Sequence, residues 1–237
     1  SPAVNTGDYN TAVGYQAGDA LTTGSANVAI GYEALSADGV GQYTIAIGSE
    51  AGTSQNIAST GDPANVYIGN SAGKFNVTGT SNTYIGSKAG FGVSTNSNSA
   101  NTAVGAGAMY DVTTGGSNVA MGTDAMKNIT TGNYNIGIGV EVLSGITTGY
   151  GNVAIGWYAA NIADTATVNA IDNVYVGKTA GRYMDDGQYN VAVGSRAMLG
   201  ASTGNNATFN TAVGQASLLA ITTGDNNTAV GSNSADA

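Results

Sequence analysis

Two short segments of the sequence carry residue types that could bind a phosphate or a metal ion. Val176-Gly177-Lys178-Thr179 has the form of the end of a phosphate-binding loop, but the glycine that such a loop needs five residues before Gly177 is replaced by Asp172. Asp185-Asp186-Gly187 could offer carboxylates to calcium, yet neither an EF-hand pattern nor a Gly-Gly-x-Gly-x-Asp repeat surrounds it. We interpret the first segment as one copy of a longer repeat and the second as a solvated turn.

The chain lacks the residues on which most enzyme and metal sites depend. It contains no His and no Cys, which removes the commonest general base and excludes thiolate metal sites and disulfides. Apart from Asp185-Asp186, its carboxylates form no clustered pair in the sequence. We therefore predict no enzymatic activity, no catalytic residue, no bound metal and no cofactor.

Aromatic residues offer a different chemistry, because an exposed flat ring can stack on the apolar face of a sugar. Tyr15, Tyr32 and Trp157 each follow a glycine of the repeat described below. Trp157 and Tyr158 also precede a long insertion. The alternative reading is that these rings stack on one another between neighbouring coils. The candidate ligand-binding residues are Trp157, Tyr158, Asn161, Asp164 and Asp172.

Four insertions lengthen the repeat, and they fall within residues 52–64, 90–100, 160–172 and 199–209. Each lies between the second part of a repeat and the next Asn, so we expect all four to emerge along one edge. Solenoids commonly carry their binding surface on such an edge. The insertion that follows Trp157 is therefore the preferred site for a lateral partner.

The pentapeptide Asn-x-Ala-(Val/Ile)-Gly places these residues, and it occurs thirteen times. Eight of the twelve intervals between its glycines are 17 residues, and the others are longer by two to four. A fixed period of this size is typical of stacked structural units. We predict one all-β domain, 1–237, a parallel β-solenoid of about 13 coils. The closing glycines are at positions 14, 31, 48, 69, 86, 105, 122, 139, 156, 177, 194, 214 and 231.

The residue types within the motif predict which side of each strand is buried. The residue before the glycine is aliphatic or Met, and the one two positions earlier is Thr or β-branched, so we expect both to face into the coil. The residue between them is small in most copies. Beside an unvarying glycine this indicates a second backbone close by, a positive φ, or both, and we favour a second chain. The oligomer-interface candidates are Ala12, Ala29, Ala46, Tyr67, Tyr84, Ala103, Ala120, Ala154, Tyr175 and Ala192.

Two further features of the repeat predict local structure. After the glycine, Ala recurs three residues on and several copies end in Thr-Thr-Gly, as at Thr113-Thr114-Gly115, which indicates a second short strand and a turn. Asn opens twelve of the thirteen motifs, with Thr44 as the exception. Asn bonds its own neighbouring backbone in turns, and stacked amides can form a ladder.

The motifs resemble those of known fibre proteins. Asn-Thr-Ala-Val-Gly-Tyr-Gln-Ala (10–17) and Asn-Val-Ala-Ile-Gly-Tyr-Glu-Ala-Leu (27–35) resemble the head repeat of trimeric autotransporter adhesins. The longer spacing with Thr-Thr-Gly is more similar to the repeats of bacteriophage tail-fibre proteins. The resemblance covers nearly the whole chain. It implies a left-handed parallel β-roll, a parallel homotrimer, and an adhesive or host-recognising role.

Charge and the repeat together limit the possible partners. The net charge is −9 with six basic residues, which argues against nucleic acid and against an anionic membrane, and no apolar stretch is long enough to insert in a membrane. We predict a structural or adhesive fibre segment at a cell surface, on a virion or otherwise outside the cell. Its partners would be its own copies and a cell-surface glycan or receptor. A filament subunit that stacks head to tail and an ice-binding solenoid are the alternatives.

Overall fold

The computed structural model describes residues 6–57, 62–93, 96–161, 170–184, 186–201 and 205–235. Each of the thirteen motif copies forms a strand of three residues, and no helix occurs in the described ranges. The all-β parallel solenoid predicted from the repeat is confirmed. The chain forms two compact units, unit 1 (residues 1–117) and unit 2 (residues 118–237). That the two units make up one domain stays a prediction.

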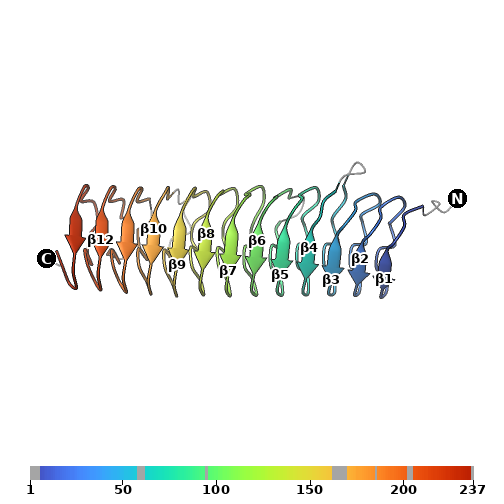
Figure 1. The fold of residues 1–237 in the computed structure, drawn as a ribbon, viewed down its shortest axis with the longest axis horizontal. Coiled ribbons are helices and arrows are strands. Elements are labelled where there is room, and N and C mark those ends of the chain that lie inside the picture. The colour runs from blue at the N-terminus through green and yellow to red at the C-terminus, as the bar shows by residue number, and fades with distance from the viewer. Residues whose placement is uncertain are drawn as a thin grey trace. The chain divides into compact units, whose positions relative to one another are not determined.

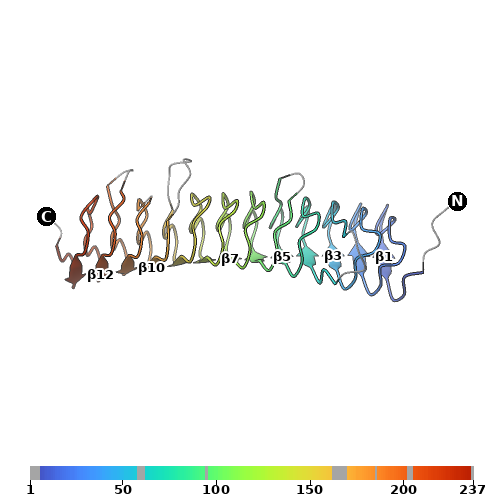
Figure 2. The same cartoon turned by 90° about the horizontal axis from the view of Figure 1, so that it is seen from above.

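Unit 1 is a stack of coils in which each strand pairs in parallel with the strand of the next coil (Figure 1). The register is direct, so that Ala46 lies opposite Tyr67. Figure 2 shows the strands of this unit along one side and the turns on the other. The strands are β1 (Thr11–Val13), β2 (Val28–Ile30), β3 (Ile45–Ile47), β4 (Val66–Ile68), β5 (Thr83–Ile85) and β6 (Thr102–Val104).

Unit 2 repeats this arrangement with the same parallel pairing and the same direct register, so that Ala154 lies opposite Tyr175. Its strands are β7 (Val119–Met121), β8 (Ile136–Ile138), β9 (Val153–Ile155), β10 (Val174–Val176), β11 (Val191–Val193), β12 (Thr211–Val213) and β13 (Thr228–Val230).

The glycine that closes each motif is required for two reasons at once. Its φ lies between 124° and 142° in all thirteen copies, a conformation that costs little only for glycine. A Cβ atom added at Gly31 would lie 2.4 Å from the carbonyl oxygen of Gly48. The backbone that approaches this glycine is therefore the next coil of the same chain. The prediction that it belongs to a second chain is wrong.

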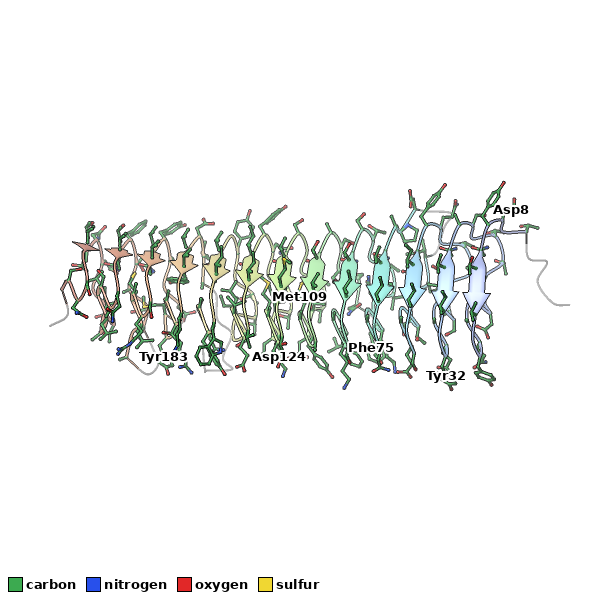
Figure 3. The ribbon with its side chains drawn as sticks, turned by 60° about the horizontal axis from the view of Figure 1, so that its bottom comes forward. Asp8, Tyr32, Phe75, Met109, Asp124 and Tyr183 are labelled. Atoms are coloured by element: carbon green, nitrogen blue, oxygen red, sulfur yellow. The ribbon has the colours of Figure 1, made fainter. Side chains whose placement is uncertain are left out.

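The register predicted for the strand side chains is wrong. The middle residue of each strand points into the coil, as at Ala103 and Ala154, which are fully buried. The residues before the glycine face outward, and Ile85 is 36% and Ile138 37% exposed. The physical reason is space, because large side chains from the segment after the glycine, such as Met109, already fill the narrow interior (Figure 3).

In most coils, the middle strand residue and the residue six positions later have complementary volumes. Tyr84 is followed by Gly90, and a Cβ atom at Gly90 would lie 2.3 Å from the Tyr84 ring. Ala103 is followed by Met109, which is fully buried. The backbone is the same in both cases, with φ of 55° at Gly90 and 53° at Met109. The same pairing joins Tyr67 to Gly73 and Tyr175 to Gly181.

The second strand predicted for each coil is also wrong. In the described ranges, the segments outside the thirteen strands form only isolated parallel bridges, such as Asn133 with Tyr150. Residues with positive φ, for example Glu33 and Leu35, follow the glycine at every second position and interrupt an extended conformation. Backbone hydrogen bonds between coils still continue there, as from Thr22 N to Gly39 O at 2.8 Å.

The predicted Asn ladder is confirmed. Asn82 Oδ1 accepts the backbone N–H of Asn101 one coil later at 3.0 Å, while Asn82 Nδ2 donates to the Asn98 carbonyl at 2.8 Å. Asn152 makes the same contacts in unit 2, with Asn173 N at 3.1 Å and the Ala170 carbonyl at 2.7 Å. Each amide thus satisfies buried backbone groups that have no strand partner.

Thr44 interrupts this ladder, and a different amide takes over. Gln55 Nε2 donates to Thr44 Oγ1 at 3.0 Å and to Asp38 Oδ2 at 2.6 Å, and Gln55 Oε1 accepts from Asn65 Nδ2 at 2.9 Å. All four side chains are fully buried. Gln55 therefore supplies, from another part of the coil, hydrogen bonds that the short Thr44 side chain cannot make.

Tyr84 and Gly90 are expected to tolerate substitution only when both are replaced together, so that the total side-chain volume is kept. Tyr84→Ala should lower the free energy of unfolding by roughly 3–5 kcal/mol because it leaves a cavity. Gly90→Met alone should overpack the coil. The double variant recreates the Ala103 and Met109 pair of the next coil, so it should be more stable than either single variant. Urea unfolding of the three variants measures this, and strictly additive losses would contradict the complementarity.

Removing one ladder amide is expected to be far more damaging than removing an exposed one. Asn82→Ala should cost roughly 2–4 kcal/mol, because two buried backbone groups lose their partners. Asn70→Ala is the matched control, since Asn70 is exposed and its amide lies 3.5 Å from the Ser49 carbonyl oxygen. Equal unfolding midpoints for the two variants in urea would show that the ladder does not hold the coils together.

Candidate interaction surfaces

The outward residues of the strands form an exposed aliphatic surface in each unit. This surface, the strand face, consists of the first and third residues of every strand. Among its residues are the half-exposed Met121, Ile136, Ile138, Ile155, Val193 and Val213 of unit 2 and Ile85 of unit 1. Most of its members are Val or Ile, and no charged residue occurs among them.

The predicted oligomer-interface residues lie inside the coils instead. Ala29, Ala46, Tyr67, Tyr84, Ala103, Ala120, Ala154, Tyr175 and Ala192 are at most 1% exposed, whereas Ala12 of the first strand is exposed. A side chain that its own coil covers is not available to a second chain. The smallness of these residues reflects the narrow interior, and the surface open to a partner is the opposite one.

A row of aromatic rings borders the strand face at the start of the strands. Tyr134 and Tyr150 pack edge to face with ring centroids 5.2 Å apart, and Tyr189 stacks on Phe209 at 4.9 Å. All four are exposed. The sequence reasoning missed this row, although its signal was present, because three of the four rings directly precede the Asn of a motif and the fourth, Tyr150, precedes it by two residues.

The rings that follow the motif glycines behave differently in the two units. Tyr15 and Tyr32 are stacked with centroids 5.5 Å apart, which confirms the alternative of stacking between coils for this pair. Trp157 is half-exposed and lies edge to face against Tyr158 at 5.0 Å. Lys178, from the next coil, places its ammonium 4.6 Å from the Trp157 ring centroid.

The structure brings together only part of the predicted ligand site. Tyr158 donates its hydroxyl to Glu141 Oε1 at 2.9 Å, and Asn161 Nδ2 donates to the Glu141 carbonyl at 2.9 Å and to Ser144 Oγ at 2.7 Å. The hydrogen bond to the Glu141 carboxylate raises the pKa of the Tyr158 hydroxyl. Asn161 is buried and holds two coils together, so it is not free for a ligand.

The remaining two candidates do not join this group. Asp172 is exposed but precedes the strand β10, whereas Trp157 follows the strand β9. Because the strands are parallel, the two lie at opposite strand ends. Asp164 lies outside the described residues, as do residues 58–61, 94–95, 162–169 and 202–204 of the four insertions, so the predicted edge of insertions stays a prediction.

Basic residues complete two clusters that sequence reasoning did not find. In unit 2 the Arg182 guanidinium lies 4.9 Å from the Tyr158 ring and 5.0 Å from the Tyr183 ring. In unit 1 Lys74 lies 5.5 Å from the Phe75 ring and forms an ion pair with Glu50 at 2.8 Å. Figure 3 places Phe75 and Tyr183 at the edge of their units away from the strand arrows. The signal in the sequence was a basic residue five positions after a motif glycine, Lys74 after Gly69 and Arg182 after Gly177.

The structure bears on the other chemistries considered from the sequence. Gly177 has the same φ, 138°, as the other motif glycines and follows the strand β10, so Val176 to Thr179 is one more repeat copy. Within the described ranges, no group of three His, Cys, Asp or Glu residues could hold a metal ion. Asp185 of the candidate calcium segment lies outside those ranges. In those ranges, no helix is long and apolar enough to cross a membrane.

An ice-binding solenoid would have to present its Thr-Thr pairs to water, but some of these Thr residues are engaged within the protein. Thr22 Oγ1 donates to the Gly39 carbonyl at 2.9 Å, and Thr130 Oγ1 donates to the Thr147 carbonyl at 3.1 Å. A hydroxyl that bonds the next coil is less free to order water. The Thr-Thr pairs therefore serve the stacking of the coils.

Removing Lys74 is expected to make the protein less sensitive to acid. The hydrogen bonds from Lys74 and Ser71 lower the pKa of Glu50 from its ordinary value of 4.5. A carboxylate with a lowered pKa adds stability above its unfolded-state pKa, and this is lost as the pH falls through the folded-state pKa. In Lys74→Gln, urea unfolding should show a smaller loss of stability between about pH 5 and pH 3.

The control for this experiment is Lys127→Gln, which removes the same charge from a more exposed ion pair with Asp124 at 3.6 Å. It should leave the pH dependence close to that of the parent. If Lys74→Gln and the parent lose stability equally over this range, the ion pair does not stabilise the fold.

Comparisons with known proteins found no relative. No family model matches the chain, and no similar curated protein or solved structure was found. The surfaces described above are therefore what indicates a function.

Proposed function

We propose that this protein is a structural and adhesive fibre segment that works as a homo-oligomer, with the strand face as the contact between copies. The coils would be left-handed and the assembly a parallel homotrimer, located outside the cell, on a cell surface or on a virion. The observation that carries the proposal is the exposed aliphatic strand face of each unit.

An uncovered surface of this kind is unusual for a protein that acts alone. Monomeric soluble proteins rarely expose large contiguous apolar patches, and parallel sheets normally have both faces covered. Here one side of each strand packs inside the coil, while the other carries Val and Ile side chains that face outward. Burying them against an identical surface would remove the apolar area from water and add to the stability of every coil.

The width of the strand face favours a closed ring of copies. Each strand has three residues, so the face is only two side chains wide in every coil. A narrow strip buries little area against one flat partner, whereas rotational symmetry brings three strips to a common axis. The bordering rings of Tyr134, Tyr150, Tyr189 and Phe209 would lie at the rim, and aromatic residues are enriched in interfaces.

The adhesive part of the proposal concerns the opposite ends of the strands. Trp157, Tyr158 and Tyr183 lie after the strands, away from the aromatic row that precedes them. An assembly through the strand face would leave this edge open on every copy. A repeated array of weak sites binds a surface far more tightly than one site does, which suits attachment to a cell-surface glycan or receptor.

Placing a charge on the strand face is expected to dissociate the assembly. The parent should elute with a mass of about 70 kDa by light scattering, which is three chains of 23.3 kDa. Ile85→Asp should give the mass of one chain, because a carboxylate in an apolar contact is strongly disfavoured. Val93→Asp is the control, since Val93 is a more exposed aliphatic residue of unit 1 that lies outside the strands.

A parent that is already monomeric would overturn the proposal, as would equal dissociation by both variants. Growth of the parent into filaments that Ile85→Asp does not prevent would favour the head-to-tail alternative instead. Circular dichroism of each variant establishes that a change of mass is not a loss of folding.

A further inference from the structure

We propose that Trp157, Tyr158, Lys178, Arg182 and Tyr183 form a binding site for an acidic carbohydrate, a sugar that carries a carboxylate. This cluster, the basic aromatic site, combines rings from two neighbouring coils with two cations from the second coil. The inference rests on the adhesive part of the proposed function, which it narrows to one class of glycan. It does not depend on the number of chains in the assembly.

Among the residues that the structure describes, neither cation of this site has a carboxylate partner. The chain has six basic residues and a net charge of −9, so acidic groups are abundant. The ion pairs within the described ranges join Lys74 to Glu50 and Lys127 to Asp124, and neither Lys178 nor Arg182 takes part in one. A cation left unpaired on an acidic protein is available to an anionic ligand.

The surroundings of Arg182 hold its guanidinium in place. It lies beside the faces of Tyr158 and Tyr183, and arginine stacks well on aromatic rings because its guanidinium is planar and weakly hydrated. Its buried Nε atom has no hydrogen-bond partner. A buried donor without a partner is costly, and the fork of N–H groups is suited to the two oxygens of a carboxylate.

The acidic residue in the cluster is already occupied. Glu141 Oε1 accepts the hydroxyl of Tyr158 at 2.9 Å, and Glu141 forms no ion pair with Arg182 within 4.0 Å. Glu141 therefore fixes the Tyr158 ring and does not neutralise the exposed Lys178 or the partly exposed Arg182, which are the positive groups of the site.

The half-exposed Trp157 ring gives the site its second element of recognition. A flat indole ring offers apolar surface for the C–H groups of a sugar at little entropic cost. The Lys178 ammonium, 4.6 Å from the ring centroid, stands where a carboxylate on the sugar would meet it. Ring and cation together thus fit a charged sugar better than a neutral sugar or a simple anion.

The net charge of the protein restricts the ligand further. An acidic protein repels long polyanions such as nucleic acids. Two local cations can attract a ligand of modest charge at short range, because salt screens the distant carboxylates more than the close ones. A short acidic oligosaccharide meets this condition.

The corresponding cluster of unit 1 has these properties only in part and serves as an internal comparison. Its Lys88 lies 5.9 Å from the Phe91 and Tyr110 rings and joins no ion pair within the described residues, but it is the one cation there that is left unpaired in that part of the chain. Lys74 is neutralised there by Glu50 at 2.8 Å. Its rings cover one another, because Phe91 stacks on Tyr110 and also meets the edge of Phe75, both at 4.9 Å. We therefore assign the site to unit 2.

Fluorescence of the full chain tests the proposal directly, because Trp157 is its only tryptophan. Trigalacturonate is expected to change the emission of the parent in a saturable way. Its methyl ester, which keeps the sugar rings and removes the charge, should bind at least tenfold more weakly. Lys178→Gln and Arg182→Gln should each weaken trigalacturonate binding about tenfold. Lys127→Gln, which removes the same charge elsewhere, should bind like the parent.

Three results would overturn the inference. These are no saturable change up to about 10 mM trigalacturonate, equal binding of the methyl ester, and equal weakening by Lys127→Gln. Light scattering of the same samples separates this outcome from that of the proposed function. An oligomer that does not bind trigalacturonate refutes only the site, whereas a monomer that binds it refutes only the assembly.

Discussion

The backbone of each coil lies so close to the next that no side chain fits at the closing glycine of the motif. This contact sets the spacing between neighbouring coils, and the side chains of each coil must pack within that spacing. The interior holds the large side chains of the segment after the glycine, such as Met126 and Ile129, and the strand adds a large one only where that segment carries a glycine, as with Tyr84 and Gly90. The remaining aliphatic residues must face outward, and they create the surface from which an assembly is inferred.

The period of the repeat was sufficient to predict the stacking of the coils and the parallel order of the motif strands, because stacking of equal coils follows from periodicity alone. The direction of the strand side chains could not be obtained in the same way. Alternation in a strand defines two faces but not which one is interior, and the usual rule that aliphatic residues are buried selected the wrong face. A better signal was in the sequence. Tyr at 67, 84 and 175 is followed by Gly six residues later, whereas Ala103 and Ala120 are followed by Met at the same distance. When one position is large only where the other is small, the two side chains fill the same space in the interior.

The candidate site was only partly predictable for a related reason. Trp157 and Tyr158 stood out because of their residue type, but the cations beside them come from the next coil and are 20 or more positions away in the sequence. Residues that meet across two coils usually stand 17 positions apart. The interval from Gly156 to Gly177 is 21 residues, so a search at the regular spacing does not pair Trp157 and Tyr158 with Lys178 and Arg182. Asn161 and Asp172 were chosen for their nearness in sequence. The structure assigns the first to the packing of the coil and the second to the far end of the strands.

The Thr44 substitution in the amide ladder has a mechanical consequence for unit 1. The hydrogen bonds between coils are directed from one coil to the next, so a pulling force along the stack loads every junction in series. A chain of junctions in series breaks at its weakest member, whatever the strength of the others. At Thr44 the repeated backbone contact is replaced by a longer path through Gln55 and the buried Asp38. Under tension the strength of this junction depends on the Gln55 amide, which the regular coils do not need.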